Sequence, residues 1–304
     1  NENGNADVTV EAGAIEGDLF IRGDYDEATE TSYFGVWIGE KWLDIAGEMN
    51  AAEVKDRGNL TVHADSVDEK SSGSGEGISI VPFEVPSGAT ITVDVAGDVT
   101  VVSEGHDDEW GSEYDGIFIA FDDAEAGSEL NISTGNLTVD ASADALAEAG
   151  GIWTGPFGLA NGVTVNIDTG SINVAAGTEE NSSSVGMSIS TPDETVTNIN
   201  VSGDVTATGG GTGARAVLLY SGGTTSLTVT GDVSAESDSY ALGCRINPWD
   251  NGVINITVDG NVSSEGEEST GLCVWADDES IANCTVDGNV RAINGEGIYV
   301  ESTE

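Results

Sequence analysis

Basic residues are scarce in this chain. Only 8 lysines and arginines stand against 55 aspartates and glutamates, which gives a formal net charge of −47 over 304 residues. So strong a negative field repels nucleic acid, acidic phospholipid and polyanionic glycans before contact, and disfavours them as partners. We expect partners that are neutral or cationic, or that are bridged by metal ions. The alternative interpretation is that the acidic surface only keeps a β-rich protein soluble and its strand edges apart.

Long apolar runs and aromatic residues are also lacking. No apolar run reaches 18 residues, so we expect no membrane-spanning segment. Aromatic residues make up 6% of the chain, and no stretch has a convincing helical period. Together with 42 glycines, this composition favours a narrow β-rich core of small aliphatic side chains.

Cysteine is limited to three residues, Cys244, Cys273 and Cys284. Their spacing matches no zinc site. Cys244 and Cys273 fall on equivalent strands of neighbouring repeats but one residue out of step, which points their side chains to opposite faces. We therefore expect free, mostly buried thiols, and a disulfide between these two residues is the alternative.

What the chain does have is a repeat. A glycine followed by a short polar residue and then an aliphatic one recurs nine times, and apolar residues alternate with polar ones after it at strand period. A second strand precedes this glycine. A third strand follows after a loop and usually opens with another glycine, as at Gly35–Ile38 and Gly297–Val300. The nine motif glycines are Gly17, Gly58, Gly97, Gly135, Gly170, Gly203, Gly231, Gly260 and Gly288.

The repeat predicts an all-β fold: a right-handed parallel β-helix, or β-solenoid, of about nine three-strand coils, built as one domain over residues 1–304. The interval shrinks from 41 residues between Gly17 and Gly58 to 28 between Gly260 and Gly288. Three strands and three corners fit in 28 residues, whereas left-handed hexapeptide helices repeat at about 18. No separate globular unit is expected.

Each corner has a physical reason for its residues. Glycine permits a positive φ or a very close backbone approach, and the Asp or Asn that follows it can accept bonds from nearby N–H groups. Stacked coils should align these side chains into a ladder of hydrogen bonds. Asp204 above Asp232 is the exception in which two acids meet.

One acidic loop suggests a metal site. It begins at Gly105 and holds five carboxylates, the oxygen ligands that calcium prefers. The spacing matches neither an EF-hand nor the glycine-rich calcium nonapeptide, so an ordinary acidic loop is the alternative. No cofactor is required, and calcium is the one that this loop suggests. The predicted ligands are Asp107, Asp108, Glu109, Glu113 and Asp115.

Aromatic residues follow the third strand in several repeats and should line one edge of the rod. Sugar rings stack on aromatic faces while their hydroxyls bond to carboxylates, so this edge is a candidate carbohydrate-binding site. The alternative is that the rings cap the core. The residues are Phe83, Phe121, Phe157, Tyr220, Trp249 and Trp275.

The coil pattern resembles the right-handed parallel β-helix (pectin-lyase-like) superfamily over nearly all 304 residues. That superfamily includes pectate lyases, polygalacturonases and adhesin-like surface proteins. Polygalacturonase-like enzymes carry Asn-Thr-Asp, then Asp-Asp, Gly-His-Gly and Arg-Ile-Lys. Here His106 precedes Asp122 and Asp123, and Arg245 is followed by Ile and Asn rather than Ile and Lys. The resemblance therefore implies an adhesin-like bacterial or archaeal surface protein rather than an enzyme.

We therefore expect a non-enzymatic, extracellular β-solenoid without catalytic residues, a cell-surface stalk or binding region that takes neutral glycans or a surface protein as partner. One alternative is a self-assembling filament or surface-layer subunit that associates head to tail, because the last coil offers unpaired backbone groups. Another is a polysaccharide lyase or hydrolase that uses Asp122 and Asp123, although adjacent strand residues point opposite ways. The uncapped last coil also suggests a segment of a longer surface protein.

Overall fold

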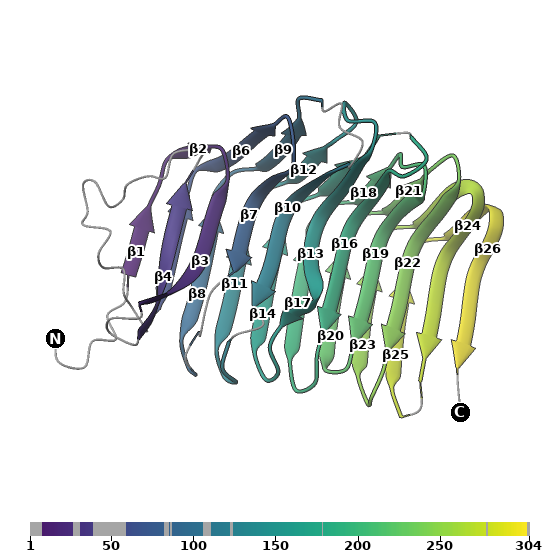
Figure 1. Cartoon of the computed structure of the whole chain (residues 1–304). Coiled ribbons are helices and arrows are strands. Elements are labelled where there is room, and N and C mark those ends of the chain that lie inside the picture. Colours follow the sequence, from purple (N-terminus) through teal and green to yellow (C-terminus); the bar gives the residue numbers. More distant parts are fainter. Residues whose placement is uncertain are drawn as a thin grey trace.

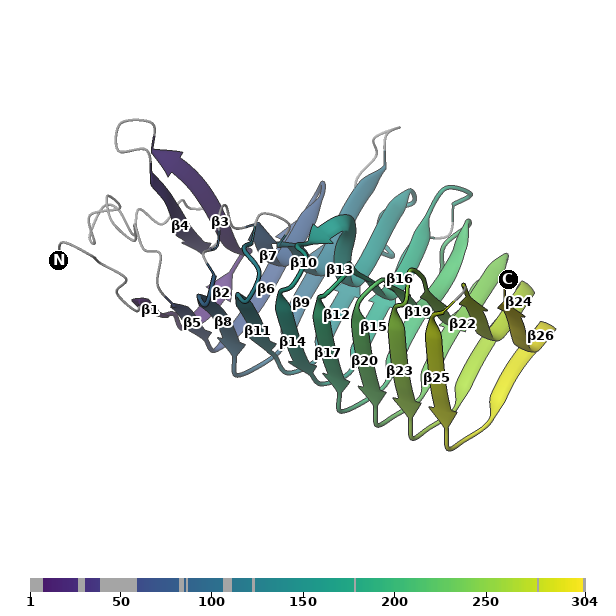
Figure 2. The same ribbon diagram turned by 90° about the horizontal axis from the view of Figure 1, so that it is seen from below.

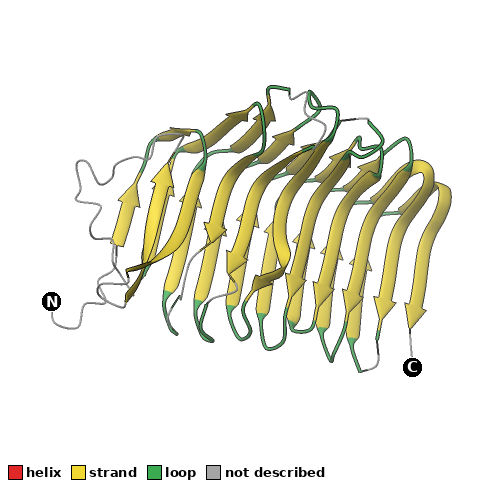
Figure 3. Ribbon diagram, in the orientation of Figure 1, coloured by secondary structure: helices red, strands yellow, loops and turns green. Residues whose placement is uncertain are grey.

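The computed structural model describes residues 8–26, 31–38, 59–81, 85, 87–105, 111–121, 124–177, 179–277 and 279–302. Every regular element in these ranges is a β-strand, and the chain winds into an elongated solenoid (Figures 1 and 3). In Figure 1 the strands nearer the reader run downward and those behind run upward, while the chain advances from left to right. The winding is therefore right-handed, as the sequence predicts and as parallel crossovers nearly always are.

The solenoid has three faces, and strands of successive windings pair in parallel on each. The first face is a nine-stranded sheet in chain order. It consists of β1 (Val8–Glu11), β5 (Leu60–Ala64), β8 (Thr90–Val95), β11 (Glu129–Ser133), β14 (Thr164–Thr169), β17 (Val196–Val201), β20 (Thr224–Val229), β23 (Val253–Val258) and β25 (Ile281–Val286).

The second and third faces are joined at the C-terminal end by two long, bent strands, β24 (Val262–Ala276) and β26 (Val290–Ser302), whose first halves lie on the second face and second halves on the third. The rest of the second face is β2 (Ala14–Glu16), β6 (Ser66–Ser71), β9 (Val99–Ser103), β12 (Leu137–Asp140), β15 (Ile172–Ala175), β18 (Val205–Thr208) and β21 (Val233–Glu236). The rest of the third face is β3 (Leu19–Asp26), β7 (Gly75–Val81), β10 (Ser112–Phe121), β13 (Ala147–Leu159), β16 (Ser183–Thr191), β19 (Gly213–Ser221) and β22 (Tyr240–Pro248).

The regular part of the solenoid has about seven turns rather than the nine predicted. The glycines from Gly97 to Gly288 do lie at the corner between the first and second faces. The first two motifs were assigned to that corner wrongly, because Leu19 pairs with Ile78 on the third face and Leu60 pairs with Ile91 on the first. All three faces alternate apolar and polar residues, so a short glycine motif alone does not identify its face.

The predicted third strand at Gly35–Ile38 is also a correction. It belongs to β4 (Thr31–Ile38), which pairs with β3 in antiparallel register, Leu19 opposite Ile38. Figure 2 shows this hairpin at the N-terminal end of the solenoid. β3 therefore has the antiparallel partner β4 as well as the parallel partner β7.

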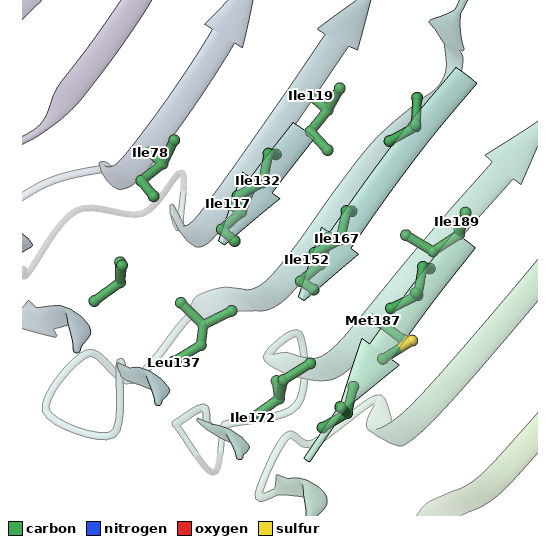
Figure 4. Close-up of a cluster of buried hydrophobic side chains, with 14 of the residues drawn as sticks. Ile78, Ile117, Ile119, Ile132, Leu137, Ile152, Ile167, Ile172, Met187 and Ile189 are labelled. Atoms are coloured by element: carbon green, nitrogen blue, oxygen red, sulfur yellow. The ribbon is translucent and has the colours of Figure 1, made fainter. Parts of the chain in front are cut away.

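The core is filled by aliphatic side chains stacked in register, as the sequence predicts. Ile117, Ile152 and Met187 follow one another on the third face and have no solvent-exposed surface (Figure 4). Leu137 and Ile172 face them from the second face. Burial of each such side chain stabilises the fold by about 1.5–3 kcal/mol before the loss of chain entropy is counted. Within the described ranges, no helix has the length and apolarity that crossing a membrane would need.

The corner glycines serve close approach rather than unusual backbone angles. None of the seven from Gly97 to Gly288 has a positive φ. A Cβ on Gly97 would lie 2.5 Å from the carbonyl oxygen of Asp65, and one on Gly170 would lie 2.5 Å from Oδ1 of Asn136. Any larger residue would push successive windings apart at this corner.

The predicted ladder beside these glycines is present, and backbone N–H groups carry it. Oδ1 of Asp232 accepts the N–H of Asn261 at 2.7 Å, and Oδ1 of Asn261 accepts that of Asn289 at 2.9 Å. Asp204 and Asp232 are accommodated in the same way, because Oδ1 of Asp204 accepts the Asp232 N–H at 2.7 Å. The column is structural, as expected.

Replacing Asn261 by alanine should lower the free energy of unfolding by about 1 kcal/mol, because the Asn289 N–H loses its acceptor. Asn261→Asp keeps that acceptor but sets a second carboxylate beside Asp232. The loss of unfolding free energy caused by Asn261→Asp should therefore shrink as salt rises, while the loss caused by Asn261→Ala should not. Urea unfolding at low and high salt measures both. Equal salt dependence of the two variants would contradict the ladder as described.

All three cysteines are free, as expected. Cys244 pairs with Leu272 and Cys273 with Arg245, which is the one-residue offset inferred from the sequence. Cys244 points into the core and Cys273 outward. Burial raises the pKa of the Cys244 thiol well above its usual range and that of Cys284 to about 11. These thiols are protonated and poorly nucleophilic at neutral pH.

Candidate functional site

The outer surface of the third face carries the chemistry. Here we define two neighbouring groups of outward side chains. The acidic cluster lies on β7, β10 and β13, and the aromatic–arginine surface extends from β13 to β26. The acidic cluster is Glu76, Glu113, Asp115 and Glu148. The aromatic–arginine surface is Trp153, Val185, Arg215, Leu218, Tyr220, Tyr240, Leu242, Arg245, Cys273, Trp275 and Tyr299.

Parallel register brings the acidic cluster together. Asp115 pairs with Glu76 on one side, and Glu113, two residues earlier on the same strand, pairs with Glu148 on the other. Asp115 is only 3% exposed, and in the described part of the chain its carboxylate has neither a hydrogen bond nor an ion pair. Burial, followed by the charges of Glu113, Glu76 and Glu148, raises the pKa of Asp115 well above its ordinary value.

The Asp115 carboxylate extends over Gly150, whose missing Cβ leaves room for Oδ1. It lines a hollow of about 230 Å³ that is open to solvent. The hollow lies where the acidic cluster and the aromatic–arginine surface meet. Its walls include Glu113, Asp115 and Glu148 on one side and Trp153, Arg215 and Leu218 on the other.

On the aromatic–arginine surface, each arginine lies against aromatic rings. The guanidinium carbon of Arg245 is 4.0 Å from the centre of the Trp275 ring and 5.6 Å from that of Tyr220. Arg215 lies 5.5 Å from the ring of Tyr240. Across the described ranges neither arginine pairs with a carboxylate, and the Nε of Arg245 is buried without a partner. In a chain of net charge −47, these cations are held by rings rather than by acids.

The predicted calcium ligands are brought together in part. Glu113 and Asp115 both belong to the acidic cluster, whereas Asp107, Asp108 and Glu109 lie outside the described residues. The sequence did not reveal Glu76 and Glu148, because they come from neighbouring windings more than 30 residues away. Among the residues that the structure describes, no three histidine, cysteine or acidic side chains already converge in a way that would hold a metal ion.

The predicted aromatic edge is corrected in one place and relocated in others. Phe121 is fully buried in the core, because it follows the inward-facing Ile119 by two residues. Tyr220 and Trp275 both lie against Arg245 on the outer surface of the third face. Trp249 is half-buried in the turn after β22. Phe83 and the side chain of Phe157 lie outside what the structure describes, as do His106, Asp122 and Asp123.

The sequence does contain a signal for several residues of the aromatic–arginine surface that were not predicted. The second residue after each third-face glycine points outward, and these residues form one register column. Ala216 takes the place of glycine in one winding. The column runs Ser79, Phe118, Trp153, Ser188, Leu218, Arg245, Cys273 and Tyr299.

Comparison with protein-family models, with curated proteins and with solved structures found no match to this chain. The surface itself, rather than a relative, therefore carries the argument on function.

Proposed function

We propose that this chain is a non-enzymatic, extracellular, adhesin-like β-solenoid, a stalk or binding region whose third face binds a neutral carbohydrate. The observation that carries the proposal is the aromatic–arginine surface, in which rings and guanidinium groups free of carboxylate partners share one outward face. Aromatic rings offer apolar faces to the C–H side of a sugar. The N–H donors of Arg215 and Arg245 suit its hydroxyl oxygens.

The geometry also favours an extended ligand. Equivalent positions recur at every winding, so the aromatic–arginine surface repeats along the rod at about 4.8 Å per strand. Trp275 is 39% exposed at one end of this surface, and Trp153 lines the hollow at the other. The net charge of −47 disfavours a polyanionic glycan through long-range repulsion. A neutral oligosaccharide lying along the rod fits both properties.

Trp275→Ala should weaken binding of a neutral oligosaccharide at least about tenfold, because the sugar loses a stacking surface and Arg245 loses its support. A glycan array would find the tightest neutral ligand, and calorimetry would compare the variants. Trp249→Ala is the matched control, since Trp249 lies in the turn after β22 and not on the aromatic–arginine surface. An array without a neutral glycan ligand, or an equal loss in both variants, would contradict the proposal.

A self-assembling filament or surface-layer subunit is the second candidate. It is favoured by the apolar side chains that the last described winding exposes, Ile281 at 49%, Ile298 at 59% and Val300 at 68%. Parallel addition of another winding would cover them. A polysaccharide lyase or hydrolase stays a prediction that depends on Asp122 and Asp123.

A further inference from the structure

We propose that the acidic cluster is a binding site for a hard divalent cation, calcium before magnesium. This inference goes beyond the carbohydrate-binding surface and does not depend on it. It starts from Asp115, which is 3% exposed and has no partner for its carboxylate in the described part of the chain. A buried, unpaired charge is strongly unfavourable unless something neutralises it.

The paired and adjacent carboxylates around Asp115 add negative charge, and Arg215, which also lines the hollow, lies three strands further along the third face. Glu76 is its neighbour on β7, Glu113 precedes it on β10, and Glu148 lies beside Glu113 on β13. These carboxylates come together on three paired strands and repel one another there. A bound cation would reverse the sign of that electrostatic interaction.

The cluster also has room for an ion. Gly150 leaves space over the sheet for Oδ1 of Asp115, and the hollow of about 230 Å³ gives access from solvent. Glu113 and Glu148 are exposed on adjacent strands, so their side chains are free to turn toward Asp115. Binding of a cation would draw these carboxylates toward one point, where the structure does not yet gather them.

Calcium fits this arrangement better than magnesium. Calcium accepts six to eight oxygen ligands in irregular geometry and keeps some water, whereas magnesium demands a near-ideal octahedron. Carboxylates that project from parallel strands, together with water from the open side of the hollow, would supply an irregular set of oxygen ligands. We therefore expect tighter binding of calcium at equal concentration.

Terbium luminescence tests the site, because Trp153 lines the same hollow and would transfer excitation energy to a bound lanthanide. In buffer of physiological ionic strength, Tb³⁺ should show sensitised emission that calcium displaces. Trp153→Phe should remove most of this emission, because the nearby indole that donates the excitation energy is lost. Emission that persists in Trp153→Phe would place the ion elsewhere and overturn the proposal.

Asp115→Asn should weaken calcium binding at least about tenfold. Asp168→Asn is the matched control, since Asp168 is exposed on β14 of the first face and the change in charge is the same. A diffuse cation atmosphere around the acidic chain would make the two variants equal, and that result would overturn the site. Circular dichroism would verify that both variants fold. Calcium binding can be absent while carbohydrate binding is present, and carbohydrate binding can be absent while calcium binding is present. The two proposals are therefore tested separately.

Discussion

Gly151→Val should lower the free energy of unfolding by at least about 3 kcal/mol, and the variant is expected to accumulate poorly as folded protein. Gly151 lies at the inner bend of β13. A Cβ at this position would lie 2.6 Å from Cγ2 of Ile172 and closer still to the carbonyl oxygen of Gly186. Both neighbours are fixed by packing or by the parallel ladder, so the backbone itself would have to move.

Two substitutions serve as controls for this prediction. Gly73→Val makes the same change where a Cβ would meet nothing within 4 Å, and its stability should stay close to that of the wild type. Ala216 occupies the position that Gly151 and the other third-face glycines hold in their windings. Ala216→Gly removes its methyl group and should lower the free energy of unfolding by about 1 kcal/mol, through lost burial and added chain entropy. Guanidinium unfolding compares all three. If Gly151→Val were as stable as Gly73→Val, the close approach at the bend would be wrong.

Asp115→Asn should raise the free energy of unfolding by about 1–3 kcal/mol at pH 7 without calcium, because it removes a buried charge that has no partner. The pKa of Asp115 in the folded state is raised above its ordinary value of 3.8. As pH rises from that value through the folded pKa, the unfolded chain releases its proton first. The wild type therefore loses stability with rising pH in this window, and Asp115→Asn should lose less.

Denaturant unfolding at a series of pH values from 4 upward provides the measurement. Asp168→Asn again controls for the change in net charge, because its carboxylate is exposed. Saturating calcium should stabilise the wild type more than Asp115→Asn, since it binds the folded site. An Asp115→Asn variant that is less stable than the wild type at pH 7 would show that this carboxylate is satisfied in the folded protein.

The winding could be predicted from the sequence because its determinants are local. A strand period, a glycine at each corner and a polar residue after it recur within every repeat, and stacking follows from them. The assignment of Gly17 and Gly58 failed because the three faces share that pattern. The pairings of Leu19 with Ile78 and of Leu60 with Ile91 distinguish the faces, and such pairing is a relation between windings.

The candidate site was harder to predict because it depends on register. Glu113 and Asp115 were found together since they share a strand, whereas Glu76 and Glu148 join them only across windings. Phe121 was placed outside by its position after the third strand. Counting by twos from the inward Ile119 gives the correct answer, since alternate strand residues share one side.

The pairing scheme makes the length of the third face an adjustable quantity. Each winding pairs only with the one before it and the one after it, so its contribution to stability is a nearest-neighbour term. Insertion or loss of one whole repeat, such as the 28 residues from Gly203 to Thr230, would change the rod's length in a single step of about 4.8 Å. The repeat that begins at Gly203 holds Arg215, Leu218 and Tyr220, so adding or removing one copy would lengthen or shorten the aromatic–arginine surface itself.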